Sequence, residues 1–130
     1  MMMIFGRELE LGGSDMQFII YNKDTPLMRV FWDKAQAKSE WLSNFRHPNI
    51  FPYMYPDCIT VSAIVRFCES RLPPRSRVNI DELLRKKYKL TTYQPIQMCR
   101  VTRGISHSDD LWLLFEGEEQ VPYASITVRY

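Results

Sequence analysis

Two strand-like patterns, one near each end of the chain, constrain the fold most. From Met16 to Asn22 apolar side chains fall on both faces of an alternating segment, which is typical of a central strand. Residues 23–26 are polar and include a proline, which indicates a turn. Alternation resumes from Leu27 to Trp32. The two segments are predicted to form a β-hairpin with a four-residue connection.

Strand patterns return at the C-terminal end. Residues 111–115 are apolar throughout, and residues 121–130 alternate apolar with polar side chains. Both segments are predicted to be strands. Because strands occupy both ends and helices the middle, we expect an α+β fold with a mostly antiparallel sheet and about three helices packed on one face.

Helical signals fill the middle of the chain. Asp57 can cap a helix that runs to about Arg71, where two prolines follow. Asn79 begins a second helix in a capping-box-like arrangement. A third runs from Pro95 to the glycine at position 104. Residues 33–44 favour a short exposed helix by composition, whereas the proline-rich segment 46–56 is predicted to be an extended loop.

The chain is predicted to form one domain. It has 130 residues, of which 45% are hydrophobic and 25% charged, so a packed core is expected and a disordered chain is not. Residues 1–15 are expected to be a flexible N-terminal extension, because a Gly-Gly-Ser-Asp joint ends them. Residues 16–130 then form the single α+β domain.

Several functional classes find no support in the residues. No apolar run approaches the length that spans a bilayer, and no secretory signal opens the chain. The three cysteines are odd in number and widely spaced, which indicates buried thiols in a cytoplasmic protein. Phosphate loops, dinucleotide fingerprints and metal-ligand spacings are lacking. We therefore expect no enzyme activity, no cofactor and no metal.

Charge is unevenly distributed although the net charge is only +2. Residues 66–89 hold eight basic and three acidic residues, and residues 109–119 hold five acidic and no basic residues. The stiff, proline-bearing turn Arg71–Arg77 carries three arginines, whose planar donors suit phosphate or carboxylate groups. The simpler interpretation is a solvated connector whose arginines pair with acids of the same chain.

A second segment, Gly104–Trp112, places serine, histidine and aspartate close together. Neighbours in sequence do not make a catalytic triad, because the three groups must converge in space. A helix stop followed by a Ser/Asp-rich turn is the simpler interpretation, with the tryptophan entering the core. A small hydrolase that uses His107 is therefore the least favoured hypothesis.

These two segments carry a resemblance. Phe67-x-Glu69-Ser70-Arg71-x-x-Pro74-Arg75-Ser76-Arg77 and Gly104-x-Ser106-x-Ser108-Asp109-x-x-Trp112 resemble the R-x-x-P…R and G-x-S-x-S-D-x-x-W segments of HipA-type kinase operon proteins. The resemblance extends roughly over residues 17–115, although the proline-rich segment 46–56 departs from it. It implies a non-catalytic, antitoxin-like partner that docks on and restrains a HipA-type serine/threonine kinase.

Docking on a partner is expected to involve residues of both segments. The residues expected to bind the partner are Arg71, Pro74, Arg75, Ser76, Arg77, Ser106, Ser108, Asp109 and Trp112. An adjoining basic patch comprises Arg85, Lys86 and Lys87. The alternative is a mobile-element or phage inhibitor of the anti-CRISPR type, whose basic patch acts on a nucleic-acid-handling complex. Nucleic acid would then be contacted directly or through the partner, and the oligomeric state stays open.

Overall fold

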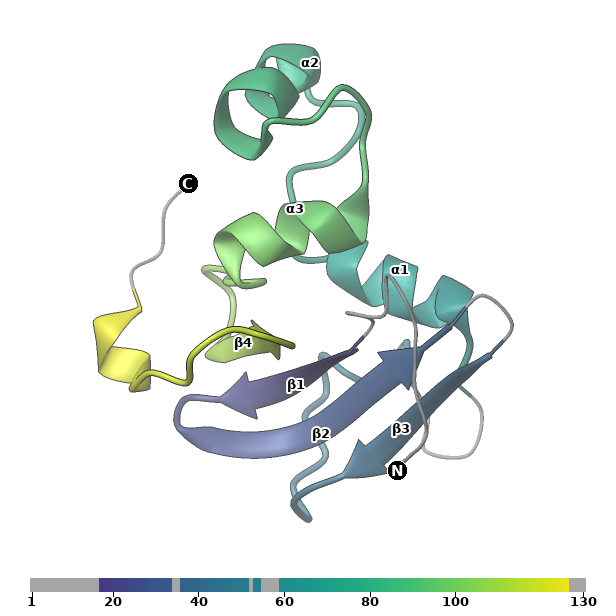
Figure 1. Cartoon of the computed structure of the whole chain (residues 1–130), viewed down its shortest axis with the longest axis vertical. Coiled ribbons are helices and arrows are strands. Elements are labelled where there is room, and N and C mark those ends of the chain that lie inside the picture. Colours follow the sequence, from purple (N-terminus) through teal and green to yellow (C-terminus); the bar gives the residue numbers. More distant parts are fainter. Residues whose placement is uncertain (1–16, 34–35, 52, 55–58, 127–130) are drawn as a thin grey trace.

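A four-stranded antiparallel sheet forms the base of the molecule (Figure 1). The computed structural model describes residues 17–33, 36–51, 53–54 and 59–126. The strands are β1 (Gln17–Asn22), β2 (Thr25–Trp32), β3 (Ala37–Trp41) and β4 (Leu111–Phe115). Their order is β3-β2-β1-β4, so the first strand is central and the C-terminal strand lies beside it, as the apolar patterns predicted.

The N-terminal hairpin is confirmed, but its turn is tighter than predicted. Asn22 pairs with Thr25, which leaves Lys23 and Asp24 as a two-residue connection in place of the expected four. Lys23 adopts a left-handed backbone with φ 54°. This conformation suits the short hairpin, because its twist matches that of the flanking strands. Pro26 therefore lies within β2.

The helix predicted over residues 33–44 is wrong, because this segment contains β3. Ala37 and Trp41 are half-buried, whereas Lys38 and Glu40 between them are exposed, which is the two-residue period of an edge strand. Antiparallel pairing with β2 provides backbone hydrogen bonds along one side of β3, and Arg29 donates to Glu40 at 2.7 Å across the pair. Tertiary pairing thus overrides a composition that favours a helix.

The helices predicted in the middle of the chain are confirmed with shorter bounds. They are α1 (Val61–Glu69), α2 (Ile80–Leu83), the π-helical turn η3 (Leu84–Tyr88) and α3 (Pro95–Thr102). Thr60 caps α1 by accepting from the backbone N–H of Ala63 at 3.0 Å, while Asp57 lies outside the described residues. The side chain of Asn79 accepts from Arg77 and makes no cap bond, so the predicted capping box does not form.

Helices α1 and α3 cover one face of the sheet (Figure 1). The main core lies between these layers and contains Phe18, Ile20, Ile64, Phe67 and Phe115 among others. A smaller cluster on the opposite face joins Tyr21 and Trp112 to residues of the C-terminal segment. Both faces of β1 are therefore apolar because both are covered.

The strand predicted over residues 121–130 is wrong within the described part. The chain forms a 3₁₀ turn, η4 (Tyr123–Ser125), and residues 127–130 lie outside the described part. The backbone N–H of Tyr123 donates to Asp24 at 2.7 Å, and its hydroxyl donates to Asp110 at 3.0 Å. These bonds hold the C-terminal segment across the second face of the sheet, so it does not extend the sheet as a fifth strand.

A third apolar cluster attaches α2 and η3 to the rest of the molecule. Leu84, Tyr88 and Met98 are buried in it, so η3 packs against α3. Figure 1 shows α2 and its neighbouring turn standing away from the sheet beyond α3. Within the described residues, none of the helices has the length and apolar character required to cross a membrane.

Candidate functional site

The two segments that carry the family resemblance meet at a buried ion pair. Arg71, just after α1, donates to both carboxylate oxygens of Asp109, at 2.5 and 3.2 Å. The side chains are only 3% and 4% exposed. This two-bond geometry matches the planar guanidinium to the carboxylate, and the low exposure leaves both groups little contact with bulk water.

Both members of the pair make further hydrogen bonds. Arg71 donates to the carbonyl oxygens of Gly104 and Leu111, while Asp109 accepts from Asn49 at 2.6 Å and from the backbone N–H of Leu111 at 3.0 Å. Burial alone raises the pKa of Asp109, but the bonds from Arg71 and Asn49 outweigh it and hold the pKa below its ordinary value. Through these bonds the pair joins the end of α1, Asn49 and the start of β4.

Three of the residues expected to bind the partner have buried side chains in this structure. Arg71 and Asp109 are sequestered in their own pair, and Trp112 is fully buried. The indole of Trp112 stacks on Tyr21 with ring centroids 4.7 Å apart and donates to the carbonyl oxygen of Lys23 at 2.7 Å. These three residues specify the fold, and they present no surface to a partner in this structure.

The two serines that precede Asp109 form a local turn. Ser106 and Ser108 have their hydroxyl oxygens 3.0 Å apart, and the backbone N–H of Ser108 donates to Ser106 at 3.3 Å. A pocket of about 210 Å³ lies beside this turn and is lined in part by Ser108, Arg71 and Asp109. Arg71 and Asp109 already bond each other, so a ligand in this pocket could bind either charged group only by breaking the ion pair.

Acid stability should report the state of Asp109. The unfolded carboxyl has a pKa of about 3.9, and the folded value is lower, so the unfolded chain binds more protons in this window. The contribution of the pair is complete above about pH 4 to 5 and is lost as the pH falls through the folded pKa. We expect Asp109→Asn to lower the free energy of unfolding at pH 7 by on the order of 1–3 kcal/mol and to flatten its decline between pH 5 and 2.

Urea unfolding at several pH values measures this dependence. Asp81→Asn, which removes an exposed carboxylate of α2, controls for the change in net charge. An Asp109→Asn variant with the acid dependence of the wild type would contradict the assignment.

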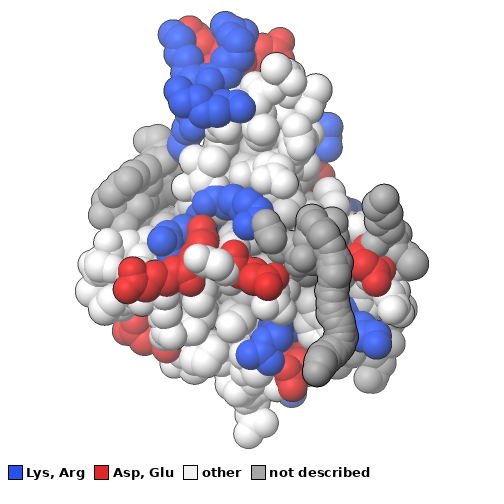
Figure 2. All heavy atoms as spheres, viewed as in Figure 1, with Lys and Arg blue, Asp and Glu red and all other residues white. Residues whose placement is uncertain are grey.

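A cluster of exposed cations lies on a separate part of the molecule, residues 75–89, here called the basic lobe. Lys and Arg cover its surface over α2 and η3 (Figure 2). The lobe has six basic and two acidic residues. Its exposed basic side chains are Arg75, Arg77, Arg85, Lys86 and Lys89. The predicted basic patch is therefore continuous with the arginines of the preceding turn.

Contacts within the lobe leave much of its positive charge toward solvent. Arg75 donates to Glu69 at 2.8 Å, and Lys86 pairs with Glu82 at 2.9 Å. Burial lowers the pKa of Lys87, and the nearby charge of Arg77 lowers it further. Pro74 and Ser76 are exposed beside these cations. Of the predicted docking residues, those in positions 74–77 are thus placed on an accessible surface.

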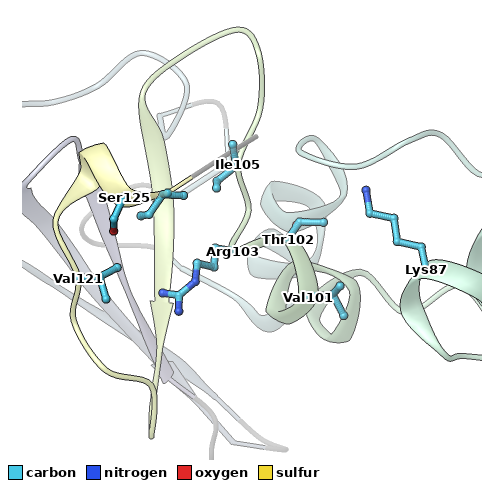
Figure 3. A pocket seen from close by; sticks show the side chains of 8 residues that line it. Lys87, Val101, Thr102, Arg103, Ile105, Val121 and Ser125 are labelled. Atoms are coloured by element: carbon cyan, nitrogen blue, oxygen red, sulfur yellow. The ribbon is translucent and has the colours of Figure 1, made fainter. Parts of the chain in front are cut away.

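A pocket that the sequence did not indicate lies at the C-terminal end of α3. It measures about 500 Å³ and is lined by Lys87, Val101, Thr102, Arg103, Ile105, Val121, Ser125 and Ile126. Figure 3 shows Arg103 between the end of α3 and the C-terminal segment, with Lys87 on the far side of α3. The one feature of the sequence that could have indicated this pocket is the arginine before Gly104, but basic residues are ordinary at the C-terminal end of a helix.

Other kinds of site find little support in the described residues. No three His, Cys, Asp or Glu side chains among them gather closely enough to hold a metal ion. Asp109 is committed to Arg71 and Asn49, so it is not placed to orient a histidine as a triad would require. Comparison of the chain with protein-family models, with curated proteins and with solved structures gives no match.

Proposed function

We propose that this chain is a non-catalytic protein-binding module that docks on a HipA-type serine/threonine kinase and restrains it. The resemblance of the two segments motivates the choice of partner. The observation that carries the docking mode is the basic lobe, which also includes a fully exposed Val78 between Arg77 and the start of α2.

The proposal assigns different tasks to the two halves of the family-like pattern. Arg71, Gly104 and Asp109 hold α1 to the α3–β4 loop. Arg75 and Arg77 follow on the exposed side of the same turn. The buried half would therefore fix the shape of the module, and the exposed half would contact the kinase.

Charge and apolar contact together favour an acidic protein surface as the partner. Complementary charge speeds and orients docking, and its effect weakens with salt. The isopropyl group of Val78 gains energy by entering an apolar recess, which a phosphate backbone does not offer. This combination supports a protein partner over direct contact with nucleic acid.

Co-expression of the full chain with a HipA-type kinase from the same genome tests the proposal. We expect the two proteins to co-purify and the chain to relieve the growth arrest caused by the kinase. The double charge reversal Arg77→Glu/Arg85→Glu should weaken the complex by roughly tenfold or more at low salt. The matched control Lys38→Glu/Arg46→Glu makes the same change in net charge away from the lobe and should bind normally.

Two outcomes would overturn the proposal. One is the absence of both co-purification and relief of toxicity with the wild-type chain. The other is a lobe variant that binds as tightly as the control.

The anti-CRISPR-type inhibitor remains the second candidate, supported by the same positive charge. Direct nucleic-acid binding predicts retardation of DNA or RNA in a gel shift, with affinity that falls steeply as salt is raised. The lobe variant should then lose retardation. Retardation by the wild type without kinase binding would select this candidate, and no retardation at low salt would remove its direct-binding form.

A further inference from the structure

We propose that the pocket at the C-terminal end of α3 binds a small organic anion with an apolar body, whose carboxylate is held by Arg103. This site is separate from the docking function of the basic lobe. It rests on three observations: an unpartnered buried guanidinium nitrogen, a backbone that does not require arginine, and apolar walls around a pocket of ligand size.

The first observation is the state of the Arg103 side chain. Its Nη1 is buried and has no hydrogen-bond partner among the described residues. A buried, unpaired donor on a cation is costly, since it has lost its water without gaining an acceptor. Arg71 provides the contrast within the same molecule, because its Nε, Nη1 and Nη2 all donate to protein oxygens.

The second observation is the backbone of Arg103, which has a left-handed φ of 58°. The conformation has a structural reason, because it lets the Arg103 carbonyl oxygen accept from the backbone N–H of Leu113 in β4 at 2.7 Å. Glycine or asparagine adopts this conformation with less strain. The backbone thus explains the turn but gives no reason for an arginine side chain there.

The third observation is the composition of the walls. Ile105, which packs with Tyr21 and Trp112, forms one apolar wall of the pocket. Val121 and Ile126 of the C-terminal segment form another. Lys87 of η3 also lines the pocket, and Figure 3 shows it on the other side of α3 from Val121. A volume of about 500 Å³ suits a small molecule.

Together these features define the chemical class of the ligand. A carboxylate can accept two parallel bonds from a guanidinium and satisfy its buried nitrogen. An alkyl or aromatic body would cover the isoleucine and valine side chains. A strongly hydrated inorganic ion would leave those walls in water, so an amphiphilic anion should bind better than a bare one.

Three probes separate charge from apolar contact: octanoate, acetate and octanol. Titration into the ¹⁵N-labelled full chain, followed by NMR, should give saturable shifts with octanoate at the amides of Val101, Ile105 and Ile126. Acetate lacks the body and octanol lacks the charge, so each should bind roughly tenfold more weakly or worse.

Substitution of the arginine tests the assignment. Arg103→Asn should weaken octanoate binding by roughly tenfold or more while the chain stays at least as resistant to urea, because asparagine tolerates the left-handed backbone. Arg103→Gly provides a second variant with the same logic. Arg46→Asn removes an exposed cation that belongs neither to the pocket nor to the basic lobe, and it should leave octanoate affinity unchanged.

The proposal fails if octanoate gives no saturable shifts at the pocket. It also fails if octanol binds as well as octanoate, or if both Arg103 variants keep the affinity of the wild type. None of these results depends on kinase binding, so the docking proposal stands or falls separately.

Discussion

Arg71→Met should destabilise the fold by about 3–5 kcal/mol, more than any other single change of an ionised side chain that we predict. Methionine keeps most of the aliphatic volume but leaves the Asp109 carboxylate buried without its cation. The carbonyl oxygens of Gly104 and Leu111 also lose a donor. An uncompensated buried charge costs far more than the loss of a surface pair.

Urea unfolding of the purified variant measures the loss. Arg75→Met is the matched control, because its ion pair with Glu69 is largely exposed and worth about 0–1 kcal/mol. The double variant Arg71→Met/Asp109→Leu removes both charges and should be more stable than Arg71→Met alone. Equal losses for Arg71→Met and Arg75→Met would contradict the central role of the buried pair.

The sequence predicted much of this fold because several local signals agree with the tertiary structure. Apolar alternation identified β1 and β2, and the unbroken apolar run at residues 111–115 identified β4. Pro95 at the first turn and Gly104 after the last turn bracketed α3. At each of these elements, burial and backbone preference favour the same structure.

The sequence misled where local preference and tertiary contact disagree. Residues 33–44 have helix-favouring composition, yet the alternation from Ala37 to Trp41 matters more once β2 offers a free edge. The C-terminal alternation had the opposite outcome. Tyr123 binds Asp24 and Asp110, so the segment lies across the sheet and its apolar side chains cover Trp112.

The candidate site was predicted only in part, for a geometric reason. The arginine-rich turn and the Gly104–Trp112 segment were both recognised, but their meeting through Arg71 and Asp109 is a contact between residues 38 positions apart. Charge alone does not distinguish a buried pair from an exposed patch. Asn49 carried no signal, and an arginine at a helix end such as Arg103 is too ordinary to mark a site, because the roles of both depend on tertiary packing.

Gly104→Ala should lower the free energy of unfolding by about 2–5 kcal/mol, although it adds one methyl group. Gly104 has φ +65°, and its added Cβ would lie 2.7 Å from Cγ and 2.9 Å from Cδ1 of Leu113. The left-handed backbone accounts for about 1–2 kcal/mol, and overpacking against a fully buried leucine for about 1–3 kcal/mol.

Gly117→Ala separates the two contributions. Gly117 also has a positive φ, +90°, but an added Cβ meets nothing within 4 Å. This control should therefore lose only the backbone contribution. Urea unfolding of both variants gives the difference, which is the cost of crowding Leu113. If Gly104→Ala lowered the free energy of unfolding no more than Gly117→Ala, β4 would have shifted to make room for the methyl group. The close approach of the α3–β4 loop to Leu113, which also positions the Gly104 carbonyl for Arg71, would then be less rigid than the buried pair requires.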